Sequence, residues 1–294
     1  AILSGEGDNI FPMKVLGSGT ILNIILDPIF IYYYDIEGAA IATVFSQFIV
    51  CLIFFYYLGV RKTSYLNLSL KNLSFHPRLI KEILIIGVPS SLSMMIMAMG
   101  AFIFNIILNS PDAVAAVQTA GRIEHLFFLP IISISSSMVT LVGMFFGAQR
   151  FDLIQSIIKY GLKIGVLFSC ISAFFFFIGA RYIVPFFTDS PEIIAISISY
   201  FRIVCFSYPF VTIGMTSSRI MQGLGYGKPT LVLTLIRVVL INAPLGYFIT
   251  RIMGLPIFYI WYSILLSSFV ASTLGLLWMR VVINKEQNKI PVVT

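Results

Sequence analysis

Long apolar runs recur along the whole chain and are separated by short stretches rich in charged residues, glycine and proline. Each run is about 20 residues or longer, which is enough for a helix to cross roughly 30 Å of hydrocarbon. Alternation of apolar and polar residues over about ten positions, the pattern of a membrane barrel, is absent. The pattern therefore predicts eight membrane-spanning helices, at residues 11–34, 36–58, 79–109, 113–148, 153–187, 191–223, 229–252 and 256–283.

The composition leads to the same class of protein. Of the 294 residues, 59% are hydrophobic and 11% are charged, whereas soluble domains contain about 25% charged residues. So few charges cannot cover a water-exposed surface, so we predict an all-α polytopic membrane protein surrounded by the lipid bilayer. Pro130 and Pro209 lie inside the fourth and sixth spans and are expected to kink them.

The net charge of +7 is distributed unevenly, which argues against a nucleic-acid-binding surface. With eight spans, both chain ends lie on one side of the membrane. Fourteen of the 19 lysines and arginines fall on that side, whereas only Arg181 and Arg251 fall in the opposite loops. Because cytoplasmic loops carry an excess of positive charge, we predict a cell-membrane protein with both termini in the cytoplasm.

The sequence gives no sign of a catalytic or cofactor site. Cys51, Cys170 and Cys205 lie in apolar segments, and their spacing fits neither a disulfide framework nor a metal site. His-Glu-x-x-His and Gly-x-Ser-x-Gly motifs are absent, as are the paired aspartates of intramembrane proteases. We therefore predict no catalytic residues, no enzyme activity and no cofactor.

Two distant stretches, residues 2–31 and 220–249, share an order of residues. Each has Gly-x-Gly, then a proline, and later an asparagine and a second proline. The copies are six spans apart and so share one orientation, as in transporters built from parallel repeats. We therefore predict six-helix lobes, with residues 1–58 as the last two helices of an N-lobe, 59–81 as a cytoplasmic inter-lobe loop, 82–283 as a complete C-lobe and 284–294 as a cytoplasmic tail. By the same reasoning we expect four further helices upstream.

Asp27 places a carboxylate in an otherwise apolar span, one helical turn after Asn23. A charge inside the bilayer costs several kcal/mol, roughly, unless it is paired, protonated or bound to an ion. Pro28 leaves the carbonyl of Ile24 without its helical donor, which adds a further oxygen. We predict a proton or sodium site at Asn23 and Asp27, while the alternative is that Asp27 only forms local hydrogen bonds.

Several stretches, in order, resemble the multidrug and toxic compound extrusion (MATE) family: "ILSGEGD", "NIILDPIFI", "GAAIATVFSQ", "IGVPSSL", "GRIEHLFFLP", "GAQR" and "IMQGLGYGKPTL". "RIEH" is similar to its DinF-like branch. The resemblance begins at the family's fifth helix and implies a monomer of twelve helices in two lobes. It also implies export of cationic or amphipathic organic compounds, driven by proton or sodium ion entry, with alternating access between the lobes.

The resemblance also bears on the cation site. It adds Thr43 to Asn23 and Asp27, together with an aspartate of the first helix, which would lie upstream. Met97 and Val211 stand near the positions where other branches carry acids in the C-lobe. We therefore expect the coupling ion to bind in the N-lobe.

A second set of polar side chains lies inside the predicted spans: Arg122, Glu124, His125, Arg202 and Arg237. Two interpretations are open, a gating latch or relay in a central cavity, or structural ion pairs between helices. Glu124 lies largely on a different face from Arg122 and His125, so we expect a partner on another helix, with Arg202 and Arg237 as candidates. Met94 and Met97 could line a drug cavity, because flexible methionines suit varied ligands, but a lipid-facing position is favoured.

The leading hypothesis is therefore an ion-coupled antiporter for organic compounds. A lipid-linked polysaccharide flippase of the same superfamily is the second, and the intramembrane arginines keep it open. The third is an inactive truncated fragment.

Overall fold

The computed structural model of the chain describes residues 3, 6–59 and 76–288. These residues are almost wholly helical, and no strand occurs among them. They form two compact units, Ala1–His76 and Pro77–Thr294, which we describe separately. The boundary falls within the predicted inter-lobe loop, but residues 60–75 of that loop and 289–294 of the predicted tail lie outside the described residues. The assignment of the units to lobes stays a prediction.

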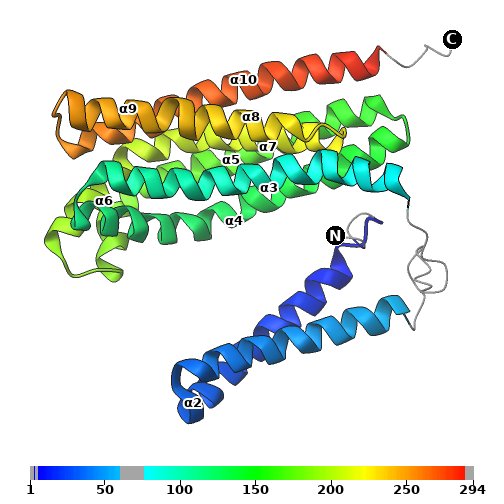
Figure 1. The fold of residues 1–294 in the computed structure, drawn as a ribbon, viewed down its shortest axis with the longest axis horizontal. Helices are drawn as coiled ribbons and strands as arrows, with labels where there is room; N and C mark the ends of the chain where they lie inside the picture. Colours follow the sequence, from blue (N-terminus) through cyan, green and yellow to red (C-terminus); the bar gives the residue numbers. More distant parts are fainter. Residues whose placement is uncertain (1–2, 4–5, 60–75, 289–294) are drawn as a thin grey trace. The chain divides into compact units, whose positions relative to one another are not determined.

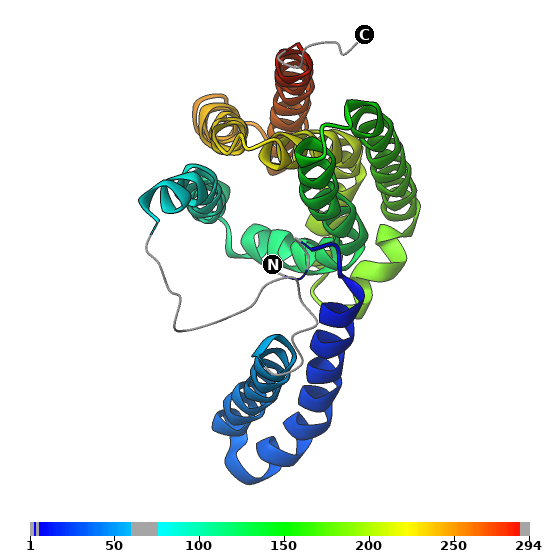
Figure 2. The ribbon, with the colours of Figure 1, turned by 90° about the vertical axis from the view of Figure 1, so that its right-hand side faces the viewer.

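The first unit is a hairpin made from one long, sharply bent helix, α2 (Ile10–Gly59). The chain reverses at Asp35, where φ is 49° and ψ is −131°. Gly38 makes the reversal possible, because a Cβ there would lie 2.1 Å from the carbonyl oxygen of Phe30. Figures 1 and 2 show the two arms side by side in blue. The arms correspond to the first two predicted spans.

Contacts at several levels hold the two arms together. Near the open end, the rings of Phe11 and Tyr57 stack with their centroids 3.6 Å apart. Further along, Gly19 leaves room for the side chain of Val50, which a Cβ at Gly19 would strike. This register continues toward the bend and brings residue 23 of the first arm beside residue 43 of the second.

The second unit contains the remaining helices (Figure 1). They are α3 (Pro77–Leu108), α4 (Pro111–Gly147), α5 (Phe151–Ile183), η2 (Val184–Phe186), α6 (Pro191–Val204), η3 (Cys205–Ser207), α7 (Tyr208–Gly223), α8 (Lys228–Leu235), η4 (Ile236–Asn242), α9 (Ala243–Tyr247), η5 (Phe248–Ile252), η6 (Ile257–Ile260) and α10 (Trp261–Gln287). In the described residues, seven helical segments are long and apolar enough to cross a membrane, and the first of them contains both arms of α2. The prediction of an all-α polytopic membrane protein is confirmed.

Prolines shape these helices in three ways. Pro77, Pro111 and Pro191 each stand at the first position of a helix, where a missing N–H costs nothing. Before Pro209 the chain passes through the short 3₁₀ segment η3, so the sixth predicted span is broken there. By contrast, Pro130 lies inside α4, which continues across it.

Helix α7 lies at the centre of the second unit and packs against α4, α5 and α10. Glycines allow these close approaches. A Cβ at Gly223 of α7 would lie 2.7 Å from the carbonyl oxygen of Val139 in α4. A Cβ at Gly161 of α5 would lie 2.5 Å from the sulfur of Met138. Small residues at these positions therefore set the spacing between the helices.

The described residues of the two Gly-x-Gly stretches in the predicted repeat share one hydrogen bond and one left-handed glycine. The N–H of Asp8 donates to the carbonyl of Leu3 at 3.0 Å, and that of Tyr226 donates to the carbonyl of Met221 at 2.9 Å. The glycine before each donor, Gly7 or Gly225, has φ near 90°. At the end of α7 this bond from the sixth residue back to the first, closed by a left-handed residue, is a Schellman motif, and the bond from Asp8 to Leu3 has the same span. The local match supports the repeat inferred from the sequence.

Candidate functional site

Three polar side chains predicted as a cation site meet between the arms of α2. The Nδ2 of Asn23 donates to Oδ1 of Asp27 at 3.1 Å and lies 3.4 Å from Oγ1 of Thr43, its second acceptor. Thr43 in turn donates its hydroxyl hydrogen to the carbonyl of Ala39 at 2.9 Å. The structure thus brings together all three residues proposed for the site, in a single unit of the chain.

The surroundings leave much of this oxygen set available. Asn23 and Asp27 are partly buried and Thr43 is exposed. Within residues 6–59 and 76–288, only Asn23 donates a hydrogen bond to the carboxylate of Asp27. Pro28 follows inside the helix and cannot donate to the carbonyl of Ile24. Carboxylate, amide, hydroxyl and carbonyl oxygens of this kind can hold a proton or a hard cation.

A clustered metal site is absent from the described part of the chain. No group of three or more His, Cys, Asp or Glu side chains gathers there. The Asn23–Asp27–Thr43 set contains a single carboxylate, so it suits a monovalent cation or a proton better than a divalent metal, which usually recruits several acidic or imidazole ligands.

The second repeat contains a neutral counterpart of this arrangement. Ser263, on α10, donates its hydroxyl to Oδ1 of Asn242 at 2.7 Å. As with Asn23 and Thr43, an asparagine before a proline bonds a hydroxyl about twenty residues later, on the following helical segment. The residue that immediately precedes the proline is Ala243 here, whereas it is Asp27 in the first repeat. Only the first copy therefore combines the pair with an acid.

Glu124 of α4 has partners on two other helices. The hydroxyl of Tyr208, in α7, donates to its carboxylate at 2.5 Å, and that of Tyr200, in α6, donates at 3.2 Å. Both rings belong to a large apolar cluster, and Tyr208 is 1% exposed. The expected partner on another helix is present, but it is a pair of tyrosines rather than Arg202 or Arg237. A tyrosine inside an apolar run is a usable signal, since a buried hydroxyl needs an acceptor.

The other predicted polar residues do not gather around Glu124. Arg122, His125 and Arg202 are exposed, and Arg237 is partly buried. In the residues that the structure describes, ion pairs join Arg78 to Glu82 and Arg150 to Asp152, and none involves these four side chains. Their proposed gating or pairing role stays a prediction. Met94 and Met97 of α3 are 73% and 51% exposed, and nothing in this unit places them at a cavity.

A polar chain that the sequence did not indicate joins α3 to α7. Arg219 donates to Oε1 of Gln222 at 3.0 Å, and Nε2 of Gln222 donates to Oγ of Ser90 at 2.8 Å. Ser90 follows Pro89 and donates to the carbonyl of Ile86 at 2.8 Å. The bond between Gln222 and Ser90 forms only because this part of α7 lies close to α3, and neither segment alone predicts that they lie close together.

Comparisons with known proteins agree on one family. Residues 89–248, more than half of the chain, match the family model described as MatE. The probable multidrug resistance protein NorM of Thermotoga maritima is 28% identical, over 98% of this chain and 65% of its own length. The multidrug export protein MepA of Staphylococcus haemolyticus is 26% identical, over 97% and 62%.

Solved structures show the same likeness. A multidrug resistance MATE family transporter of the MOP superfamily, in an outward-facing conformation, superposes with a TM-score of 0.93 at 29% identity. A MOP superfamily transporter from Pyrococcus furiosus superposes with a TM-score of 0.92 at 29% identity. Both alignments cover 97% of this chain and 65% of the solved one. The chain therefore spans slightly less than two thirds of the length of these relatives.

Proposed function

Because the chain belongs to the MatE family, we propose that the protein exports cationic or amphipathic organic compounds in exchange for protons or sodium ions. Members of this family are transporters rather than enzymes, and the helices described above make the chain a multi-pass membrane protein. The DinF-like branch within the family stays a prediction.

The observation that carries the proposal is the hydrogen-bonded set of Asn23, Asp27 and Thr43. An unsatisfied carboxylate in a membrane-spanning helix is unfavourable unless something neutralises it. We infer that an incoming proton or sodium ion does so, with the amide of Asn23 holding the carboxylate in place. Thr43 links the ion to the second arm, so that binding and release change how the two arms are held together.

This coupling would favour one state of the transporter when Asp27 is neutral and another when it is charged. A ligand shifts a conformational equilibrium only through its different affinity for the two states. Pro28 lies inside the helix beside the site and has no N–H, so the first arm can change its bend there without breaking a backbone hydrogen bond of residue 28. We propose that this local change drives alternating access between two lobes.

The proposed orientation in the cell membrane follows from charge. Within the second unit, the corner at residues 148–150, the turn at 224–227 and the end of α10 lie at one end of the helices (Figure 1). Arg150 and Lys285 belong to these segments, and Lys228 directly follows the turn as the first residue of α8. An excess of lysine and arginine favours the cytoplasmic side, so we propose that this end, and both chain termini, face the cytoplasm.

The function is tested by export from proteoliposomes that contain the intact protein, with pH and sodium gradients imposed separately. We expect Asp27→Asn to abolish gradient-driven export of a cationic dye, because a neutral amide does not take up a proton and lacks the negative charge that attracts a sodium ion. Asp189→Asn, at an exposed position between α5 and α6, is the matched control and should export normally. Gradient-driven export by Asp27→Asn at the wild-type level would refute the site. If neither the pH gradient nor the sodium gradient drives export by the unaltered protein, the proposed function is refuted.

A lipid-linked polysaccharide flippase is the second candidate. Arg122, Arg202 and Arg237 lie inside spans, and none has a carboxylate partner among the residues described. Free guanidinium groups would attract an anionic lipid-linked substrate rather than an organic cation. Translocation of a fluorescent polyprenyl-diphosphate lipid by the same proteoliposomes, without dye export, would favour this function.

A further inference from the structure

A side-chain bridge joins the ends of α5 and α10 in the second unit. Nε2 of Gln155, in the second turn of α5, donates to Oε1 of Gln287, at the end of α10, at 3.2 Å. Helix α5 runs away from this end of the unit and α10 runs toward it (Figure 1). The bridge therefore shows that Gln155 and Gln287 lie at the same height in the unit, and other residues of the two helices can be placed by their distance from it.

Three basic residues lie on the bridge side of these helices. Lys159 and Lys163 follow Gln155 by four and eight residues, so they continue roughly the same face of α5. Arg280 precedes Gln287 by seven residues, almost two full turns, which returns it to the same face of α10. At 1.5 Å per residue, all three stand roughly 6–12 Å from the bridge, on the same side of it. They therefore lie at a similar level on two helices that the Gln155–Gln287 bridge joins, and we call these three side chains the basic group.

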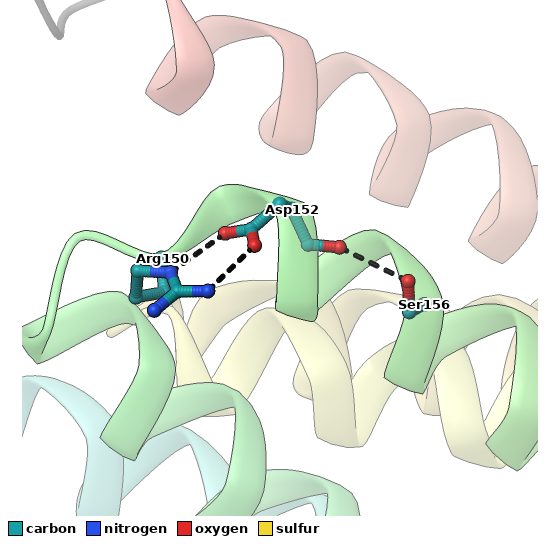
Figure 3. A network of polar contacts seen from close by, with 3 residues as sticks. All are labelled: Arg150, Asp152 and Ser156. Atoms are coloured by element: carbon teal, nitrogen blue, oxygen red, sulfur yellow. Dashed lines mark hydrogen bonds and ion pairs between the residues drawn. The ribbon is translucent and has the colours of Figure 1, made fainter.

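These three charges are available to a ligand. All three side chains are exposed, and none forms an ion pair within the described part of the chain. The nearest acids along the two helices are engaged elsewhere. Both carboxylate oxygens of Asp152 accept hydrogen bonds from Arg150, at 2.9 and 3.1 Å, and its backbone carbonyl accepts one from Ser156 (Figure 3). The carboxylate of Glu286 is 7% exposed and accepts the hydroxyl of Tyr226 at 2.6 Å.

The bond to Asp152 also sets Arg150 apart from the three free cations. Arg150 lies in the corner between α4 and α5, outside the spans. The hydrogen bond and the charge of Asp152 raise the pKa of its guanidinium, so Arg150 remains charged but already has a partner. The unpaired positive charge therefore lies further along the helices, toward the apolar part of the unit.

Exposed apolar side chains follow the basic group further along both helices. Leu167 follows Lys163 by one turn of α5 and is 55% exposed. Leu277 precedes Arg280 by about one turn of α10 and is 53% exposed. Beside Lys159, the ring of Tyr160 is 65% exposed, and tyrosine favours the boundary between lipid headgroups and hydrocarbon. A ligand on this surface would need an anionic head and long apolar tails.

We propose that the basic group on α5 and α10 binds an anionic phospholipid of the surrounding leaflet. Its phosphate lies among Lys159, Lys163 and Arg280, and its acyl chains lie over Leu167 and Leu277. Basic groups between membrane helices are suited to such headgroups, and long lysine and arginine side chains reach toward them along the helix surface. The proposal concerns a resident lipid and does not depend on what the protein transports.

The test is a lipid titration of the purified full chain in detergent, followed by native mass spectrometry. Phosphatidylglycerol should bind to the unaltered protein more tightly than phosphatidylcholine. Replacing one cation near a membrane surface weakens anionic lipid binding by about fivefold, so Lys159→Gln, Lys163→Gln and Arg280→Gln together should weaken it by about a hundredfold. The matched control, Lys14→Gln, Lys81→Gln and Lys228→Gln, removes the same charge from other exposed positions and should change binding by less than fivefold.

Three results would overturn the proposal. The first is equal binding of the two lipids to the unaltered protein. The second is an equal loss of phosphatidylglycerol binding in the two triple variants, which would show a general charge effect. The third is displacement of phosphatidylglycerol by millimolar glycerol phosphate, which would assign the site to a soluble phosphate. If the first variant elutes as an aggregate, the charge-conserving set Lys159→Arg, Lys163→Arg and Arg280→Lys replaces it and should retain lipid binding.

Discussion

Asp27 and Glu124 both lie inside spans, and the hydrogen bonds that their carboxylates accept differ. Asp27 receives one hydrogen bond, from the neighbouring asparagine. Glu124 receives two, from tyrosines of two other helices. A carboxylate with few protein donors is open to an exchanging ion, whereas one held by two buried hydroxyls is part of the helix packing. This contrast favours Asp27 for the proposed ion coupling and a structural role for Glu124.

We expect removal of the Tyr208 hydroxyl to destabilise the second unit. Tyr208→Phe keeps the ring but withdraws a donor from Glu124, and a hydrogen bond to a charged group contributes about 1.5–3 kcal/mol. Tyr200→Phe should cost less, because its hydrogen bond is longer. The measurement is thermal unfolding in detergent. Tyr247→Phe, at a 54% exposed position, should leave the melting temperature unchanged, and an equal shift in all three variants would contradict the structural role.

Sequence patterns could predict the first of these residue groups but not the second. Asn23 and Asp27 lie four residues apart in one helix, so their contact follows from helical periodicity alone. Thr43 joins them across a hairpin whose register depends on Gly38 and Gly19, and it was indicated only by family resemblance. The partners of Glu124 lie 76 and 84 residues away. That Glu124 bonds tyrosines rather than arginines depends on how α4, α6 and α7 pack together, and no local sequence pattern determines this packing.

At the scale of elements, α4 and α7 end with the same backbone hydrogen bond but with different residues at the left-handed position. After α7, Gly225 adopts φ 89°, and the N–H of Tyr226 bonds the carbonyl of Met221. After α4, Gln149 adopts φ 56°, and the N–H of Arg150 bonds the carbonyl of Phe145 at 2.9 Å. A side chain in the left-handed region carries a steric cost that glycine avoids.

This difference predicts that exchanging glutamine and glycine between the two positions changes stability in opposite directions. Gln149→Gly should stabilise the end of α4 by up to about 1 kcal/mol, because the strain of a left-handed glutamine is relieved. Gly225→Gln should destabilise the end of α7 by a similar amount. Thermal unfolding of the two variants in one detergent measures both effects. A loss of stability in Gln149→Gly would mean that its side chain makes contacts that outweigh the backbone strain.

For the whole molecule, hydropathy was sufficient to predict the class and the order of the spans. The predicted spans 11–34 and 36–58 meet at Asp35, where the observed hairpin turns. Hydropathy alone could not predict the break at Cys205–Ser207, which Pro209 did indicate, or the π-helical turns Ile236–Asn242 and Phe248–Ile252. Such departures depend on local backbone hydrogen bonds near prolines, and an apolar run looks the same with or without them.

The orientation of the whole protein is the remaining prediction from charge. Cys51, Cys170 and Cys205 are free, so a cysteine-free background can be made by alanine substitution. A single Gln149→Cys, in the corner between α4 and α5, should react with a membrane-impermeant maleimide only after cells are permeabilised. Asp189→Cys, at the opposite end of α5, should react in intact cells, because the loops there lack the positive excess.

The two positions are joined by a single span, so their labelling must differ if α5 crosses the membrane. The cysteine-free protein controls for background labelling. Reaction of Gln149→Cys alone in intact cells would invert the proposed topology and place Asp27 nearer the cytoplasmic side. Reaction of both would contradict a membrane-spanning α5.

With the predicted pattern, the Asn23–Asp27–Thr43 set lies in the outer half of its hairpin, because Asp27 is only eight residues, roughly 12 Å, before the bend at Asp35. Ions from outside would then reach the site first, as inward coupling requires.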